Sequence, residues 1–124
     1  MDDNTKAWLM RRAIQSSPHE ACGFVMESGD IIEIRNVASN SMREFKMDRN
    51  QMIEKLSGRE DFIYGIWHTH PSGSSSLSST DIEAIYCGAI QWNWHYWIVT
   101  KSEVVEYPID CYAPKPDSFW RSFT

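Results

Sequence analysis

The sequence predicts a single α/β domain in which helices flank a mixed β-sheet. Segments with apolar residues at helical spacing are interspersed with short apolar or aromatic runs that end at turn residues, an order typical of α/β or α+β sandwiches. The 124 residues are enough for one hydrophobic core but not for two. No internal repeat or linker divides the chain, so we expect one domain over residues 1–124.

The N-terminal part of the chain predicts one helix and one hairpin. Apolar positions at helical spacing indicate a helix over 4–16. Pro18 ends it, because the residue before a proline disfavours helical backbone angles. The apolar runs 21–26 and 31–38 are separated by turn residues and predict a β-hairpin.

A second helix is predicted over 49–57. Asp48 is a favoured N-cap, and Gln51, three residues later, would complete a capping box. A short extended piece is expected just before this helix, over 45–47.

The C-terminal half predicts a helix among strands. Pro71 ends the first of these strands, and a loop over 72–79 leads to a helix over 81–89, for which Ser79 or Thr80 would be the N-cap. The predicted strands are rich in aromatic and β-branched residues and cover 62–70, 94–100 and 103–109.

Composition argues against two classes of partner. The net charge of -5 opposes binding to a phosphate backbone, which needs a basic footprint. No stretch approaches the roughly 20 apolar residues of a membrane span. The N-terminus lacks the apolar core of a signal peptide. We therefore expect no nucleic-acid or membrane binding and a cytoplasmic location.

The cysteines and tryptophans have ordinary structural explanations. The cysteines are widely spaced and form no C-x-x-C pair, so a cysteine-based zinc site is not expected. Cys22 paired with a histidine would be a rival nucleophile, but a thiol in an apolar strand is usually inert. The tryptophans in 91–97 favour a packed aromatic strand over a binding face. That strand and the tail remain the candidates for a partner surface.

Two histidines one residue apart carry the chemistry that the sequence predicts. Side chains alternate along a strand, so His68 and His70 would face the same way and Thr69 the other way. Two imidazoles on one face can bind one metal ion, and Asp81 in the next helix would be the third ligand. An H-x-H pair also occurs on ordinary surfaces, so this spacing by itself leaves both interpretations open.

The full pattern is more specific. The pair is followed by a proline and then by S-x-x-D, in the segments 68–71 and 78–81, and P-x-E-x-C-G lies upstream at 18–23. In these features the chain resembles the JAMM metallopeptidases, also called the MPN-plus or Mov34 type. The resemblance covers about 5–108 and leaves a short C-terminal tail at 109–124. It implies the JAMM/MPN fold, which is cytidine-deaminase-like.

The resemblance also implies a zinc-dependent hydrolase that cleaves amide bonds. His68, His70 and Asp81 would hold one Zn²⁺ per chain, with water as the fourth ligand. Zinc lowers the pKa of bound water towards about 7. Glu20 would accept the proton of that water and pass it to the leaving amine. Ser78 would donate a hydrogen bond to the oxyanion of the tetrahedral intermediate.

Each of these residues also has a purely structural interpretation. Glu20 can be a solvated loop acid, Ser78 a helix cap, and Asp81 a first-turn acid favoured by the helix dipole. His19 and His95 are expected at the surface or in structural hydrogen bonds, and neither is expected to bind a metal.

Within the family, the chain resembles the N-terminal half of phage tail-assembly proteins of the K type. The segments that carry this resemblance are 19–26, 36–40 with Phe45, and the aromatic strand after the motif. Such proteins commonly continue into an NlpC-type cysteine peptidase domain. By this resemblance the chain is a stand-alone relative, has its partner domain encoded separately, or is truncated. The resemblance implies a proteolytic or scaffolding role among phage tail-tip proteins. A stand-alone bacterial protease that releases ubiquitin-like or sulfur-carrier proteins, and a catalytically silent scaffold, remain alternatives.

The expected substrate is a protein or peptide. An extended ubiquitin-like C-terminal tail would add along an exposed strand edge through main-chain hydrogen bonds.

Overall fold

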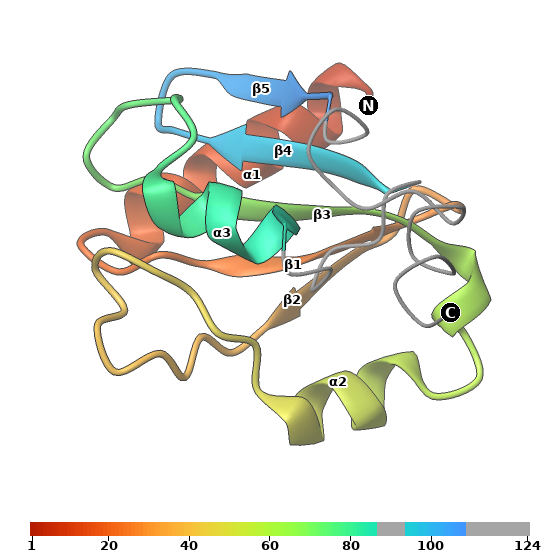
Figure 1. Ribbon diagram of the computed structural model, residues 1–124. Helices are drawn as coiled ribbons and strands as arrows, with labels where there is room; N and C mark the ends of the chain where they lie inside the picture. Colours follow the sequence, from red (N-terminus) through yellow and green to blue (C-terminus); the bar gives the residue numbers. More distant parts are fainter. Residues whose placement is uncertain (87–93, 109–124) are drawn as a thin grey trace.

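The computed structural model describes residues 1–86 and 94–108. Its secondary-structure elements follow the chain in an alternating order (Figure 1). They are α1 (Asp3–Ser16), β1 (Cys22–Met26), β2 (Ile31–Ile34), α2 (Arg49–Leu56), a 3₁₀ turn (Glu60–Phe62), β3 (Ile63–Thr69), α3 (Ser79–Tyr86), β4 (His95–Val99) and β5 (Val104–Tyr107).

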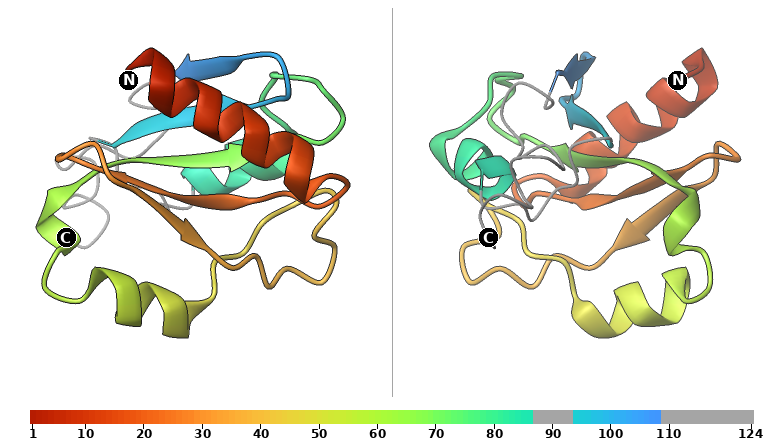
Figure 2. Two further views of the ribbon diagram at one scale, coloured as in Figure 1. Left: turned by 180° about the vertical axis from the view of Figure 1, so that it is seen from behind. Right: turned by 45° about the vertical axis from the view of Figure 1, so that its right-hand side comes forward.

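The five strands form one mixed sheet in the order β2-β1-β3-β4-β5. Strands β3 and β4 are parallel, whereas the other neighbouring strands are antiparallel. Helix α1 covers one face of the sheet, and α3 lies on the other face (Figures 1 and 2). The predicted fold class, a single-domain mixed sheet flanked by helices, is therefore confirmed.

The sheet separates two apolar clusters. One cluster lies on the α1 face, where Leu9 and Ala13 of the helix pack against Trp67 and Trp97. The cluster on the other face includes Leu56 of α2 and a row of strand residues. These strand residues are Phe24, Met26, Ile32, Ile34, Ile63, Ile66, Tyr96 and Ile98.

The close packing of β3 against β4 needs a glycine. A Cβ atom on Gly65 would lie 2.4 Å from the ring of Trp97. The indole thus occupies the space over Gly65, and Trp97 is only 4% exposed. A packed aromatic strand is therefore the correct interpretation for the described part of 91–97, and Tyr96 and Trp97 of this strand are too buried to form a partner surface. The tail at 109–124 lies outside the described residues.

Helix α2 is capped as predicted, but without the predicted capping box. The Asp48 side chain accepts a hydrogen bond from the backbone N–H of Asn50. The backbone N–H of Asp48 is already bonded to the Arg35 carbonyl, so it is not available to Gln51. Instead, the Gln51 side chain accepts from the backbone N–H of Arg35 and ties the helix to the end of β2.

Several boundaries differ from the prediction, among them those of β2 and α3. Strand β2 ends at Ile34, whereas the prediction extended it to residue 38. In the predicted extended piece 45–47, Met47 forms an isolated bridge with Asn36. Helix α3 begins at Ser79, whereas the prediction began the helix at residue 81. Ser79 is therefore inside the helix and cannot be its N-cap. The predicted end of this helix falls in 87–93, outside the described residues.

Within the described residues, no helix is long and apolar enough to cross a membrane.

Candidate metal centre

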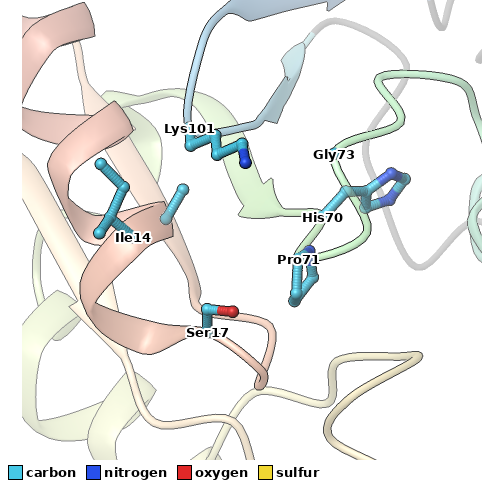
Figure 3. A pocket seen from close by; sticks show the side chains of 7 residues that line it. Ile14, Ser17, His70, Pro71, Gly73 and Lys101 are labelled. Carbon is cyan, nitrogen blue, oxygen red and sulfur yellow. The ribbon is translucent and has the colours of Figure 1, made fainter.

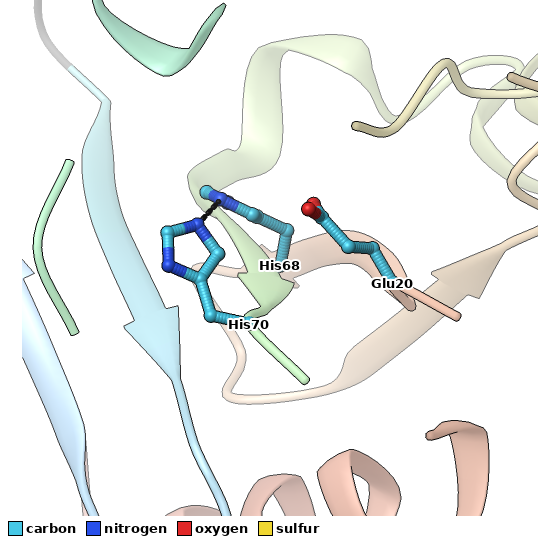
Figure 4. Close-up of side chains that lie close together, drawn as sticks. All are labelled: Glu20, His68 and His70. Carbon is cyan, nitrogen blue, oxygen red and sulfur yellow. Dashed lines mark hydrogen bonds between the residues drawn. The ribbon is translucent and has the colours of Figure 1, made fainter. Parts of the chain in front are cut away.

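The two histidines meet at the C-terminal end of β3. His68 lies within the strand and His70 just after it, and both rings are buried. Their Nε2 atoms are 3.0 Å apart (Figure 4). Thr69 faces the other way, where its hydroxyl accepts a hydrogen bond from the backbone N–H of Ala21. The predicted alternation along this strand is correct.

Asp81 joins the two imidazoles from the first turn of α3. One carboxylate oxygen lies 3.1 Å from Nε2 of His68, and the other lies 3.1 Å from Nε2 of His70. The side chain is only 5% exposed. The structure therefore brings together the three residues that were predicted to hold a metal.

Ser78 fixes the position of Asp81. The Ser78 hydroxyl accepts from the backbone N–H of Asp81 at 3.0 Å, and the Asp81 carboxylate accepts from the backbone N–H of Ser78 at 2.9 Å. This reciprocal pair is a capping box, which confirms the interpretation of Ser78 as a helix cap. The prediction of Ser79 or Thr80 as the N-cap is wrong. Because a hydroxyl that accepts one hydrogen bond can still donate another, capping does not exclude a catalytic role.

Glu20 approaches the same imidazole pair from the segment before β1. Its carboxylate points toward the two rings, and one oxygen lies within 4.8 Å of a nitrogen of each (Figure 4). The residue is 6% exposed, which corrects the interpretation of Glu20 as a solvated loop acid. Burial raises its pKa from 4.5 to about 7, and Asp81 and Glu44 add to this effect, while His70 opposes it.

The protonation states of the cluster are coupled. Burial opposes ionisation of Asp81, but hydrogen bonds from His68 and His70 outweigh it and hold the pKa of Asp81 well below its usual range. Burial lowers the pKa of His68. Burial also disfavours protonation of His70, yet its contacts with Asp81 and Ser74 raise its pKa overall. These shifts favour an ionised Asp81, which lies at the same distance, 3.1 Å, from Nε2 of both imidazoles.

The serine-rich loop contacts the candidate metal centre directly. The Ser74 carbonyl lies 2.8 Å from Nδ1 of His70. A carbonyl can only accept, so Nδ1 carries a hydrogen and Nε2 presents its lone pair in the neutral ring. The Tyr107 hydroxyl donates to the Ser75 carbonyl and ties the same loop to β5.

Sequence reasoning also missed a support for Glu20. The side-chain amide of Asn36 donates to the carbonyls of Glu20 and Glu44 at 2.9 and 3.0 Å. Its oxygen accepts from the backbone N–H groups of Ala38 and Lys46. The only available signal was the position of Asn36 in the segment 36–40, since spacing does not reveal such long-range contacts.

Phe45 is a second support, and it packs against the imidazole of His68. Its ring stacks on the His68 imidazole with centroids 4.6 Å apart and an angle of 29° between the planes. The loop between β2 and α2 thus covers Glu20 through Asn36 and His68 through Phe45.

The donor set fits a divalent cation. Two imidazole nitrogens and a carboxylate are a ligand set that zinc accepts, and ligands in a tetrahedral zinc site lie roughly 3.3 Å apart. The observed separations of 3.0 and 3.1 Å need to widen by only a few tenths of an ångström. Within the described residues, the buried atoms without a hydrogen-bond partner include one Glu20 oxygen, Nδ1 of His68 and the Tyr96 hydroxyl.

A hollow of about 200 Å³ lies behind the turn that follows His70. Ile14 and Ser17 at the end of α1, together with Lys101, line its other side (Figure 3). The His70 ring points away from this hollow (Figure 3). His70 is thus the one member of the cluster of Glu20, His68, His70 and Asp81 that lines this hollow.

The other titratable residues behave as structural groups. Burial raises the pKa of the Cys22 thiol to about 12, which agrees with an inert cysteine and not with a nucleophile. Nδ1 of His19 lies 2.6 Å from the Ser41 hydroxyl. His95 pairs with Glu106 at the sheet surface.

Comparison with known families places this centre in context. Residues 4–121 match the model of the prokaryotic homologues of the JAB domain. The chain belongs to this family. The predicted relationship to the JAB/MPN family is thereby confirmed, and the buried Glu-His-His group of this JAB domain could bind a metal ion. Family and cluster together fit a hydrolase.

A solved structure supports the fold. The solution structure of protein DSY2949 from Desulfitobacterium hafniense is similar with a TM-score of 0.61 and 19% sequence identity. The similarity covers 85% of this chain and 86% of that one. A search of curated proteins finds no match.

Proposed function

We propose that this JAB domain is a zinc-dependent metallopeptidase that hydrolyses an amide or isopeptide bond. The observation that carries the proposal is the convergence of His68, His70 and Asp81, with the Glu20 carboxylate buried beside the imidazole pair. The site is assembled at the end of a strand of the sheet and in the first turn of a helix, which favours a fixed geometry.

In this proposal His68, His70 and Asp81 hold one Zn²⁺. When bound, the cation polarises the scissile carbonyl and lowers the pKa of water in the site. Glu20 is suited to move a proton because its pKa is raised toward neutrality, where an acid–base group is most effective. Its carboxylate accepts the proton of the attacking water and returns it to the leaving amine.

Ser78 completes the proposed chemistry. Its hydroxyl oxygen accepts from the backbone N–H of Asp81, so the hydroxyl hydrogen remains available for donation. We propose that it donates to the carbonyl oxygen of the substrate as negative charge develops there.

The substrate and the biological role are proposed from the resemblance alone. The HEACGFVM segment at 19–26 and the region 36–45 support a role in phage or prophage tail-tip assembly, next to a separate NlpC-type peptidase. The alternative is release of ubiquitin-like or sulfur-carrier proteins in the bacterial cytoplasm. The genes beside this one distinguish the two: tail-tip genes favour the first role, and sulfur-carrier genes favour the second.

Hydrolysis is tested with the Glu20→Gln variant. The zinc-loaded wild type is incubated with tail-tip proteins and with sulfur-carrier proteins fused at their C-terminus to an amide-linked fluorophore. We expect cleavage by the wild type and none by Glu20→Gln at equal zinc content. Glu27→Gln, on an exposed residue after β1, serves as the matched control and should cleave normally. If the zinc-loaded wild type cleaves neither substrate group, the silent scaffold is the better account.

A further inference from the structure

Tyr96 packs against the candidate metal centre, but it is neither a proposed metal ligand nor a proposed proton carrier. It lies in β4 and is 0% exposed. Because Ile66 pairs with Tyr96 and His68 pairs with Ile98 in the parallel ladder, Tyr96 and His68 share one face of the sheet. Their rings meet edge to face with centroids 5.4 Å apart.

The Tyr96 hydroxyl is buried without a hydrogen-bond partner within residues 1–86 and 94–108. A buried phenol normally finds a partner, and leaving its hydroxyl unpaired is unfavourable. The ring belongs to the same packed cluster as Phe24, Ile66 and Ile98, so the hydroxyl cannot easily turn toward solvent. A buried unpaired hydroxyl in a native protein needs an explanation, such as a bound ligand or a side chain that moves to accept its hydrogen bond.

The groups around this hydroxyl indicate what the partner is. Burial, the charges of Asp81 and Glu20 and a side-chain contact with Asp81 all raise the pKa of this hydroxyl, although no hydrogen bond of normal geometry joins it to Asp81 in this arrangement. In the present arrangement the Asp81 oxygens face the two imidazoles, and one of them also accepts from the backbone of Ser78. A carboxylate has about four acceptor sites, so Asp81 can accept a further hydrogen bond.

Carboxylates that bind a metal are usually held by outer hydrogen bonds, and losing one typically weakens metal affinity by 10- to 100-fold. We propose that Tyr96 is a positioning residue for the metal centre: its hydroxyl donates to the Asp81 carboxylate when the cation is held, together with the backbone N–H of Ser78. This inference rests on the proposed metal site and extends it to a residue outside the sequence motif.

The other buried atoms without partners do not share this position. In the described part of the chain, the indole N–H of Trp67 and the Ser16 hydroxyl are also buried without a hydrogen-bond partner. Trp67 belongs to the cluster on the α1 face, and Ser16 is at the end of α1. Of the remaining ones, Glu20 and His68 belong to the candidate metal centre, and Tyr96 contacts it through the His68 ring.

The test compares Tyr96→Phe with the wild type in two measurements. Zinc affinity is measured by competition with a chromophoric chelator, and stability of the metal-free protein is measured by urea unfolding in EDTA. We expect about 10-fold weaker zinc binding, since one outer hydrogen bond is lost. Stability in EDTA should be unchanged or higher, because the variant lacks the unpaired buried hydroxyl. Tyr64→Phe is the matched control: Tyr64 is 41% exposed and stacks on His95, so both quantities should stay at wild-type values.

Two results would overturn the inference. One is zinc binding by Tyr96→Phe as tight as that of the wild type. The other is a loss of stability in EDTA, or a failure to fold, because that would show a merely structural role. A wild type that binds no zinc at all is a different failure: it removes the proposed metal site itself.

Discussion

The two ends of the parallel pair β3 and β4 carry similar residue types in different surroundings. At one end, His95 pairs with Glu106 at 2.8 Å and stacks on Tyr64. At the other end, His68 pairs with Asp81 at 3.1 Å and stacks on Phe45. The side chains of the first pair are 38% and 51% exposed, whereas those of the second are 0% and 5% exposed.

This difference shows that a histidine–carboxylate pair says little about function unless its burial is known. An exposed pair is solvated and contributes about 0–1 kcal/mol to stability. A buried pair has lost its hydration. At this site the imidazole of His70 and the carboxylate of Glu20, which has one oxygen without a hydrogen-bond partner, lie beside the pair. A divalent cation would satisfy these groups together, so the buried end is where binding is expected.

The largest expected effect follows from removing the buried imidazoles. We expect about one zinc per chain in wild-type protein purified without chelators, and none in the double variant His68→Ala with His70→Ala. The two Nε2 atoms are both lost, and Asp81 alone cannot form a site. Elemental analysis of the purified proteins provides the measurement.

His95→Ala is the control for this experiment, because His95 forms a similar pair at the exposed end. It should keep the wild-type zinc content. Equal zinc loss in His95→Ala and in the double variant would remove the distinction between the two ends.

The second effect is a pH dependence that belongs to the buried end. In the metal-free protein the pKa of Glu20 is raised from 4.5 to about 7. Such a group contributes stability that is present below its unfolded pKa and is lost as pH rises through its folded pKa. Between pH 5 and pH 7.5 the wild type in EDTA should therefore lose more stability than Glu20→Gln. Urea unfolding at the two pH values measures the difference, and identical pH slopes would contradict the raised pKa.

A smaller effect is expected from the ring that covers the buried pair. Phe45→Leu keeps most of the apolar volume but removes the stacking on His68. Aromatic pairs contribute about 0.5–1.5 kcal/mol beyond burial, so we expect a loss of about 1 kcal/mol in EDTA. A modest fall in zinc affinity should accompany it. Wild-type values for both quantities would show that the stacking does not position His68.

The smallest effect belongs to the exposed end. Glu106→Gln removes the carboxyl partner of His95, and we expect a change of less than about 1 kcal/mol in the free energy of unfolding. Zinc content should not change. A larger loss of stability would mean that the exposed pair is not the weak interaction that its solvation implies.

The local pattern predicted much of this structure. The aromatic and β-branched run before Pro71 predicted β3, and the period of two along it predicted that His68 and His70 share a face. The S-x-x-D spacing placed Asp81 in the first turn of a helix, although the cap proved to be Ser78. These features depend on neighbours in sequence, which is why a single sequence reveals them.

Contacts between residues far apart in the sequence could not be predicted, because they do not depend on neighbouring residues. Nothing in the spacing shows that Asn36 bonds the Glu20 carbonyl, that Phe45 stacks on His68, or that the Tyr96 ring contacts the His68 ring. The predicted capping box of α2 did not form for the same reason, because the Gln51 side chain bonds the backbone of Arg35, which follows β2 and lies 16 residues away in the sequence. Sequence reasoning therefore found the proposed ligands but missed the residues that hold them in place.

The most direct test is the anomalous scattering of zinc in crystals grown with the metal. The account predicts one strong peak per chain, about 2.0–2.2 Å from Nε2 of His68, Nε2 of His70 and an Asp81 carboxylate oxygen. Glu20 should lie beside the ion without binding it directly. No peak at this place, or a peak held by the exposed His95 and Glu106 instead, would contradict the account.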